Sequence, residues 1–157
     1  MRGKRAPKRN ILPDPKYGRV DIHKFINHVM REGKKTLAQK IVYEAFDIIK
    51  EKTKQDPVQV WEEAVKNVAP QMEVRTRRIG GAHYQIPFPV KGDRQKTLAY
   101  RWIIEAARNR KGAAMVEKLA DEIMQAAKGE GAAVKKKEEI HKMAEGNKAF
   151  AHFAKFG

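Results

Sequence analysis

The side chains whose type and spacing support a specific chemistry are arginines and lysines, and that chemistry is the binding of phosphate. The chain has 34 Lys and Arg against 19 Asp and Glu, a formal net charge of +15. A domain with this excess repels itself and gains most by binding a polyanion, from which each cation displaces a counterion. An anionic membrane fits less well, because the basic residues are spread over several predicted elements and no single amphipathic helix gathers them.

Two basic groups lie in the first quarter of the chain. No acid precedes Asp14 and three prolines oppose regular structure, so we expect an arm that orders against its partner. A frayed terminus is the alternative. The basic residues of the arm are Arg2, Lys4, Arg5, Lys8 and Arg9. Lys34 and Lys35 precede the second predicted helix, close to an N-terminus whose backbone amides also favour an anion.

A third group lies on a predicted β-hairpin. Apolar residues alternate with other residues on both sides of the glycine pair at 80–81, which predicts two strands joined by a turn. Since side chains alternate across a strand, Arg75 and Arg77 share one face and Arg78 joins the other. Arginine binds phosphate bidentately and stacks on bases. Solvated charges that prevent edge-to-edge pairing are the alternative, but three arginines exceed that need.

Further basic residues follow the hairpin. Arg94, Arg101 and Arg108 are spaced seven apart, which predicts a stripe along one helix that can track a phosphate backbone. Arg110 and Lys111 extend this stripe. Lys135 and Lys136, with Lys137 after them, open the last predicted helix, where an ordinary solvated surface is an equally good interpretation. Basic groups on the arm, the hairpin and the helix stripe indicate a large, shaped polyanion, and folded RNA fits this better than a duplex read by one element.

Residues capable of catalysis or metal binding are scattered. His23 and His28 are five apart, and the sequence contains no His-Glu-x-x-His motif, phosphate-binding loop or nucleophile elbow. The absence of cysteine excludes disulfides, thiolate zinc sites and cysteine nucleophiles. We therefore expect no enzyme activity, no metal and no cofactor.

Hydrophobic periodicity predicts a mainly α fold, a single domain of about six helices with a protruding two-stranded β-hairpin and a basic N-terminal arm. The arm is expected over residues 1–19, the helical domain over 20–149 with the hairpin near 72–90, and a C-terminal tail over 150–157. Two prolines in the second strand require an edge strand. The first helix is predicted to start at Asp21 and to be capped at its end by Gly33, and the second to run from Lys35 to Lys52. A third is predicted to start at Asp56, with Pro57 as its first helical residue, and a fourth near Asp93.

The same periodicity predicts which residues are buried. In successive helices these are Ile22, Phe25, Ile26 and Val29; Leu37, Ile41, Ala45 and Ile48; Val58, Trp61, Val65 and Val68; Leu98, Ala99, Trp102, Ile103 and Ala106; and Met115, Leu119, Ile123 and Ala126. Trp61 at this spacing is expected in the core and not as a base-stacking platform. The last helix is expected over residues 133–149.

Several runs of the sequence resemble the family of the seventh small-subunit ribosomal protein, in its bacterial form. The most specific run is residues 72–87, MEVRTRRIGGAHYQIP, and further matches are KYG at 16–18, MREGKK at 30–35, RW at 101–102 and GAAVKKKE at 131–138. The resemblance covers nearly the whole chain.

That resemblance implies more than periodicity can. It implies a structural constituent of the small ribosomal subunit that binds the 3′ major domain of the ribosomal RNA and initiates assembly of the head. The hairpin tip, Gly80, Gly81, Ala82 and His83, would lie beside the exit-site transfer RNA and near messenger RNA on the interface side. Neighbouring proteins of head and platform would be further partners, and the location would be the ribosome in the cytoplasm.

Two other classes of function stay open at this point. One is a free nucleic-acid-binding protein that compacts DNA or acts under stress. The other is a helical enzyme that uses one of the scattered histidines. An organellar origin also stays open, although no transit-like segment is present.

Overall fold

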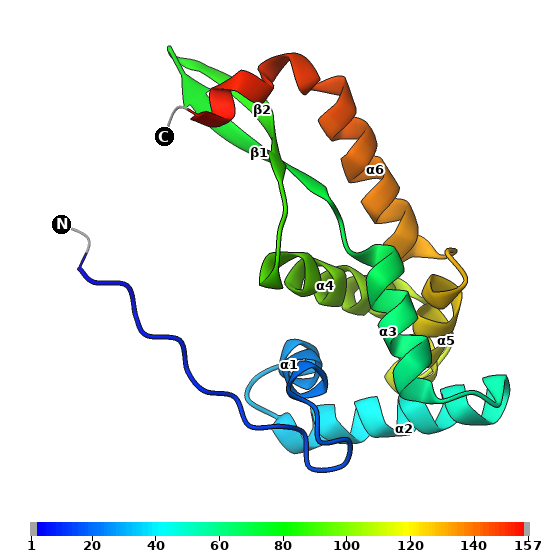
Figure 1. Cartoon of the computed structure of the whole chain (residues 1–157). Helices are drawn as coiled ribbons and strands as arrows, with labels where there is room; N and C mark the ends of the chain where they lie inside the picture. Colours follow the sequence, from blue (N-terminus) through cyan, green and yellow to red (C-terminus); the bar gives the residue numbers. More distant parts are fainter. Residues whose placement is uncertain (1–2, 156–157) are drawn as a thin grey trace. The chain divides into compact units, whose positions relative to one another are not determined.

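A computed structural model describes residues 3–155 and has a mainly α fold with one hairpin, as predicted (Figure 1). Its elements are α1 Val20–Val29, α2 Lys35–Thr53, α3 Pro57–Val68, β1 Met72–Ile79, β2 Ala82–Pro89, α4 Asp93–Asn109, α5 Met115–Ala127, α6 Ala132–Gly146 and a 3-10 helix, η1, Lys148–Lys155. The chain divides into two compact units, Met1–Lys40 and Ile41–Gly157.

The first unit holds an extended segment, a tight turn, α1 and the start of α2. The turn is organised by Asp14, which is only 1% exposed. Its carboxylate accepts the backbone N–H groups of Lys16 and Tyr17 at 3.1 and 2.9 Å, and its carbonyl accepts the N–H of Gly18 at 2.7 Å. These bonds satisfy backbone donors that a tight turn would otherwise leave without partners.

Helix α1 begins earlier than predicted. Its N-cap is Arg19, and Asp21 lies in the first turn, where its carboxylate binds the Arg19 guanidinium at 3.0 and 2.6 Å. The prediction of Asp21 as the cap was therefore wrong, but an acid in the first turn still complements the helix dipole. The helix ends at Val29 with Met30 as its cap, so Gly33 belongs to the turn before α2, where its φ is +71°. All four predicted core residues of α1 are buried.

The buried face of α2 differs from the predicted one. Ala45 is buried as expected, but Leu37 is 53% exposed and Ile41 and Ile48 are only half-buried. The buried positions are instead Ala38, Val42, Ala45, Phe46 and Ile49. Apolar residues occupy more than one face of this helix, and the face that carries the aromatic ring is the one that packs.

The core of the second unit is built around Trp61 of α3. Its ring contacts Phe46 of α2 at a centroid distance of 6.3 Å and stacks on Tyr100 of α4 at 5.7 Å. Trp61 is 1% exposed, which confirms its predicted place in the core. Asp56 caps α3 as predicted, since its carboxylate accepts the Val58 N–H at 3.0 Å.

The predicted faces of the remaining helices are partly confirmed. In α3, Val60 and Ala64 are buried where Val58 and Val65 were expected. In α4, Trp102 is half-buried, and Tyr100, Ile104 and Ala107 join the buried side. In α5, Leu119, Ile123 and Ala126 are buried and Met115 is half-buried.

A buried carboxylate joins α4, α5 and α6. Glu122 is completely buried, and its Oε2 accepts hydrogen bonds from Nε and Nη2 of Arg110 at 2.9 and 2.7 Å. Its Oε1 accepts the backbone N–H of Ala133 at 3.0 Å, so Glu122 also caps α6. A Cβ at Gly131, whose φ is +93°, would meet this Oε1 at 3.0 Å, so both the backbone and the space require glycine there.

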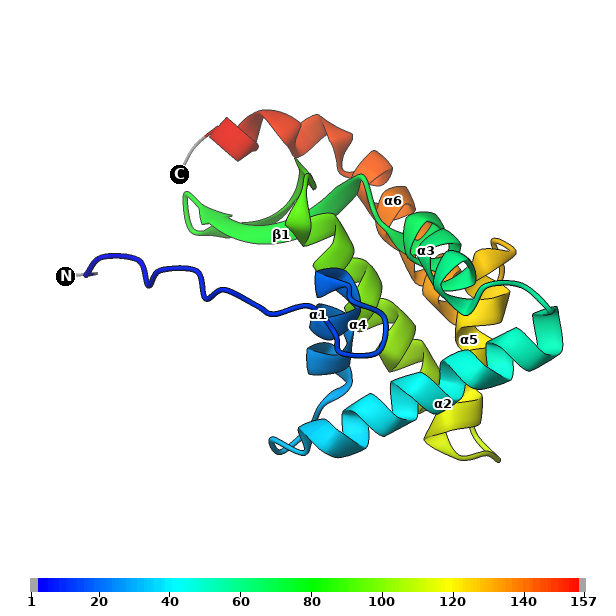
Figure 2. The same cartoon turned by 60° about the horizontal axis from the view of Figure 1, so that its bottom comes forward.

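The hairpin is confirmed with an unbroken antiparallel register from Met72↔Pro89 to Ile79↔Ala82. Gly80 and Gly81 have φ of +57° and +85°, the left-handed values that a two-residue hairpin turn requires. Helix α6 and η1 run alongside the hairpin in both views (Figures 1 and 2). The hairpin therefore has packing partners beyond its own two strands, which a lone two-stranded ribbon needs.

The C-terminal region is more ordered than a tail up to residue 155. Helix α6 ends at Gly146 and not at residue 149, and η1 follows. Phe150 and Phe153 of η1 lie 5.2 and 5.3 Å from the ring of Tyr84 in β2. Near the hairpin base, His141 of α6 accepts the Gln71 N–H at 3.0 Å. Burial and the charge of Lys137 lower the pKa of His141, which favours this neutral, accepting form.

Removing the partner of Glu122 should destabilise the second unit. Arg110→Ala leaves a fully buried carboxylate without its cation, so we expect the free energy of unfolding to fall by about 3 kcal/mol. Urea denaturation at pH 7 measures this loss. Arg101→Ala, at an exposed position of α4, is the control and should change the free energy by less than about 0.5 kcal/mol. Equal losses for the two variants would contradict the structural role of Arg110.

Candidate nucleic-acid interface

The predicted arginines of the hairpin lie on an uninterrupted strand. Arg75 and Arg78 are exposed and Arg77 is half-buried. Because the register has no bulge, side chains alternate along all of β1, which keeps Arg78 on the face opposite Arg75 and Arg77. Arg78 pairs across the strands with His83, beside the tip formed by Gly80, Gly81 and Ala82. His83 and the two glycines are exposed.

Glu73 brings Arg75 and Arg94 together, although they lie on different elements. The carboxylate is only 7% exposed. Arg94 of α4 donates to it from Nε at 3.0 Å and from Nη2 at 2.7 Å, and Arg75 donates from Nε at 2.7 Å. Two guanidinium groups share one carboxylate, so the cluster keeps one net positive charge. The Arg75 and Arg94 side chains remain 47% and 46% exposed.

Ionisation of Glu73 depends on these two arginines. Burial alone would raise its pKa, but hydrogen bonds from Arg94 and Arg75, together with their charges, lower the pKa below the ordinary value of 4.5. The bond to Glu73 likewise raises the pKa of Arg94. The cluster therefore stays fully charged at neutral pH and fixes the base of the hairpin to the start of α4.

Phe88 of β2 adds an aromatic ring to the hairpin group. The Arg75 and Arg77 guanidinium carbons lie 5.1 and 4.9 Å from its centroid, within the range of cation–π attraction. Phe88 is the cross-strand partner of Glu73, so ring and carboxylate share one face of the hairpin. This face combines charge with aromatic surface.

Some residues of the helix stripe are exposed to solvent, and Arg110 instead holds helices together. Arg94 and Arg101 are exposed and Arg108 is half-buried, on the helix α4 that the spacing predicted. Lys111 is exposed beyond the end of that helix. Arg110 binds buried Glu122 and also donates to Gln125 at 2.6 Å, so its guanidinium serves the junction of three helices. Lys135 and Lys136 are exposed in the first turns of α6.

In the first unit the arm carries its basic residues into solvent. Lys4, Arg5, Lys8 and Arg9 are exposed and have no regular secondary structure, while Arg2 lies outside the described residues. His23 of α1 fixes the base of the arm, because its Nδ1 lies 2.5 Å from the carbonyl oxygen of Leu12. The Nε2 of the same ring lies 2.6 Å from the ammonium nitrogen of Lys35. His23 therefore connects two basic groups that the sequence suggested separately.

The start of α2 presents Lys34 and Lys35 as predicted. Lys35 is its first residue, and the first turn holds no acid. Glu32 lies 3.2 Å from the Lys34 ammonium, but both side chains are largely exposed, and such a pair contributes little. An anion can displace it at low energetic cost.

The structure adds Glu73, Phe88 and His23 to the residues proposed from sequence. Sequence spacing gives no signal for Glu73 and Arg94, which lie 21 residues apart and meet only through the fold. Phe88 had a partial signal, since the hairpin register places it opposite Glu73. Sequence spacing also carries no signal for the role of His23, because its partners Leu12 and Lys35 are 11 and 12 residues away.

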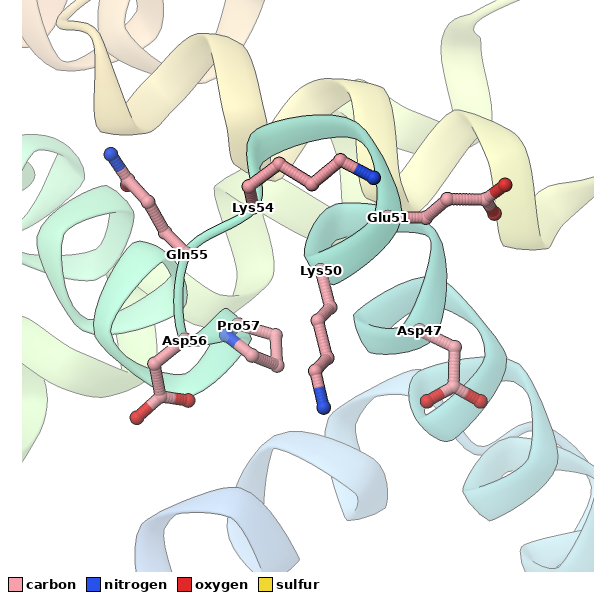
Figure 3. A pocket seen from close by; sticks show the side chains of 7 residues that line it. All are labelled: Asp47, Lys50, Glu51, Lys54, Gln55, Asp56 and Pro57. Atoms are coloured by element: carbon pink, nitrogen blue, oxygen red, sulfur yellow. The ribbon is translucent and has the colours of Figure 1, made fainter.

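A hollow on the second unit is lined by side chains of both charges. Figure 3 shows this hollow of about 660 Å³ where α2 meets α3, lined by Asp47, Lys50, Glu51, Lys54, Gln55, Asp56 and Pro57. Three carboxylates and two ammonium groups line it, so it lacks the uniformly positive charge that would attract RNA. Within residues 3–155 no three His, Asp or Glu side chains gather to hold a metal ion. The described helices also include none long and apolar enough to cross a bilayer.

Acid should release the Glu73 cluster. The folded pKa lies below the ordinary value of 4.5, so the stability from ionised Glu73 is complete above that value and is lost as pH falls through the folded pKa. Urea denaturation between pH 6 and about 3 measures this decline. Glu73→Gln cannot titrate and should show a smaller decline, whereas the exposed Glu105→Gln should follow the unmodified chain. The same decline in Glu73→Gln would show that other groups cause it.

Comparison with known proteins gives a consistent result over nearly the whole chain. Residues 1–148 match the family described as ribosomal protein S7p/S5e. The small ribosomal subunit protein uS7 of Carboxydothermus hydrogenoformans is 61% identical over 148 residues, which cover 94% of this chain and 95% of that protein. The uS7 proteins of Thermotoga neapolitana and Marinobacter nauticus are 60% and 53% identical, over 98% and 94% of this chain and 99% and 95% of theirs. The chain therefore belongs to the ribosomal protein S7p/S5e family.

Proposed function

We propose that this chain is a structural constituent of the small ribosomal subunit that binds ribosomal RNA directly and initiates assembly of the head. The relatives carry the name of a small-subunit ribosomal protein, which supports the location. A net charge of +15 supports a nucleic-acid partner. The described part of the chain offers no cluster of three His, Asp or Glu side chains for a metal ion, and the proposal requires none.

The observation that carries the proposal is the spread of exposed basic side chains over several separate elements. In the second unit they lie on β1, on α4 and at the start of α6, and in the first unit on the arm and at the start of α2. A groove reader concentrates such side chains on one element. Contacts from a strand, helices and an extended arm suit the 3′ major domain of the ribosomal RNA, whose helices and junctions meet at several angles.

The hairpin tip is the part of the proposal that concerns other partners. Gly80, Gly81, Ala82 and His83 would lie beside the exit-site transfer RNA and near messenger RNA. The tip is narrow and exposed, and its two glycines allow RNA to approach the backbone closely. Neighbouring proteins of the head and platform complete the proposed set of partners.

Binding to a head-domain ribosomal RNA fragment should weaken steeply with salt. Arg78→Ala and Arg101→Ala each remove an exposed charge, so each should reduce the slope of log K against log salt by about one. Filter binding from 50 to 300 mM salt measures the slope. Lys50→Ala, beside the hollow of mixed charge, is the matched control and should leave the slope unchanged. Absence of binding at low salt would overturn the proposed function.

The position of the tip can be tested separately in assembled subunits. A photo-reactive side chain in place of Ala82 should crosslink to transfer RNA when the exit site is occupied and lose that crosslink when it is empty. The same group in place of Gln55, at the hollow in Figure 3, should give no such crosslink. Equal crosslinking at both positions would contradict the placement of the tip.

A further inference from the structure

We infer that Arg75, Arg77 and Phe88 form a stacking site for an unpaired RNA base and that Glu73 is the residue that positions it. The inference rests on the proposed RNA-binding function and deepens it, since it names the kind of nucleotide that this face of the hairpin takes. Four side chains carry it, and all belong to the two strands of the hairpin.

One hydrogen-bonding edge of Arg75, the one formed by Nε and Nη2, is already occupied. Its Nε donates to Glu73 Oε1 at 2.7 Å, and its Nη2 forms an ion pair with the same oxygen. A phosphate that used this edge would have to displace a nearly buried carboxylate. The side chain is nevertheless 47% exposed. The contact with Glu73 holds the planar guanidinium in one orientation, which suits stacking on a base.

The Phe88 ring contacts the guanidinium groups of Arg75 and Arg77 on one face of the hairpin. Two guanidinium groups lie within about 5 Å of its centroid, at the distances given above. In the register, Glu73 lies opposite Phe88, and Arg75 and Arg77 follow at two-residue steps on the same face. Aromatic rings and guanidinium planes are the surfaces on which unpaired bases stack in proteins that bind single-stranded RNA.

The other ring on this face is already engaged. Tyr84 is the cross-strand partner of Arg77, and it packs against Phe150 and Phe153 of η1. This leaves the half-buried Phe88 as the ring that lies with the two guanidinium groups. The site therefore lies toward the base of the hairpin, away from the tip that is proposed to approach transfer RNA.

Phe88→Leu tests the stacking site without changing any charge. We expect its affinity for a head-domain ribosomal RNA fragment to fall roughly tenfold. Its salt slope should stay the same, because no cation has been lost. Affinity for a fully paired RNA duplex should not change. Phe88→Tyr keeps the ring and should retain the affinity for the fragment. Circular dichroism and the thermal midpoint confirm that each variant is folded.

Glu73→Gln tests the positioning role of Glu73. Its expected effect on affinity for the fragment is opposite to the effect expected from the change in charge alone. Loss of a negative charge should strengthen binding to any polyanion, and we expect this for the exposed Glu105→Gln and for Glu73→Gln with duplex RNA. Toward the fragment, Glu73→Gln should instead bind several-fold more weakly, because Arg75 and Arg94 are no longer held by a carboxylate. If this variant fails to fold, Phe88→Leu still decides the inference.

The outcomes separate this inference from the proposed function. If the unmodified chain binds the fragment and Phe88→Leu binds it equally well, the stacking site is wrong and the proposed function stands. A loss shared equally between fragment and duplex would also overturn the stacking site, since a duplex offers no unpaired base. Failure of the unmodified chain to bind the fragment at low salt would overturn the proposed function itself. Removing the base of the stacked nucleotide from the fragment should make the affinities of Phe88→Leu and the unmodified chain equal.

Discussion

Hydrogen bonds to buried carboxylates hold the junctions of this chain, whose formal net charge is +15. The buried acids among residues 3–155 are Asp14, Glu73 and Glu122. Asp14 closes the turn before α1, Glu73 ties β1 to α4, and Glu122 joins α4, α5 and α6. Each accepts several hydrogen bonds, which offsets the cost of burying a charge. The exposed cations keep their positions because these few anions fix the elements that carry them.

This arrangement separates two uses of arginine. Arg110 serves the fold, since its guanidinium binds a completely buried acid. Arg78 and Arg101 are exposed on a strand and a helix. Arg75 and Arg94 serve both purposes, because one edge of each guanidinium binds Glu73 while nearly half of the side chain stays exposed. A count of positive charge treats all five alike, but only the partners of each side chain show which ones can meet RNA.

Local signals in the sequence predicted much of this structure. Alternation around Gly80 and Gly81 located the hairpin, and Asp56 with Pro57 located the start of α3. The buried face of α2 could not be predicted, because apolar residues lie on several of its faces and packing, such as that of Phe46 against Trp61, selects one. The function of Arg110 could not be predicted either, since its partner Glu122 is 12 residues away on another helix. Local signals were not always sufficient, since Asp21 is not the N-cap of α1, and packing was not always beyond prediction, since Trp61 is buried as expected.

The packing of η1 on Tyr84 has a consequence for the order in which a newly made chain matures. The strands leave the translating ribosome before residues 148–155 do, so the hairpin first forms without the rings of Phe150 and Phe153. A nascent chain that stalls before Lys148 would carry the basic groups described above and yet lack the support that steadies Tyr84. The set of rings around Tyr84 is therefore complete only after residue 153 has been added to the chain.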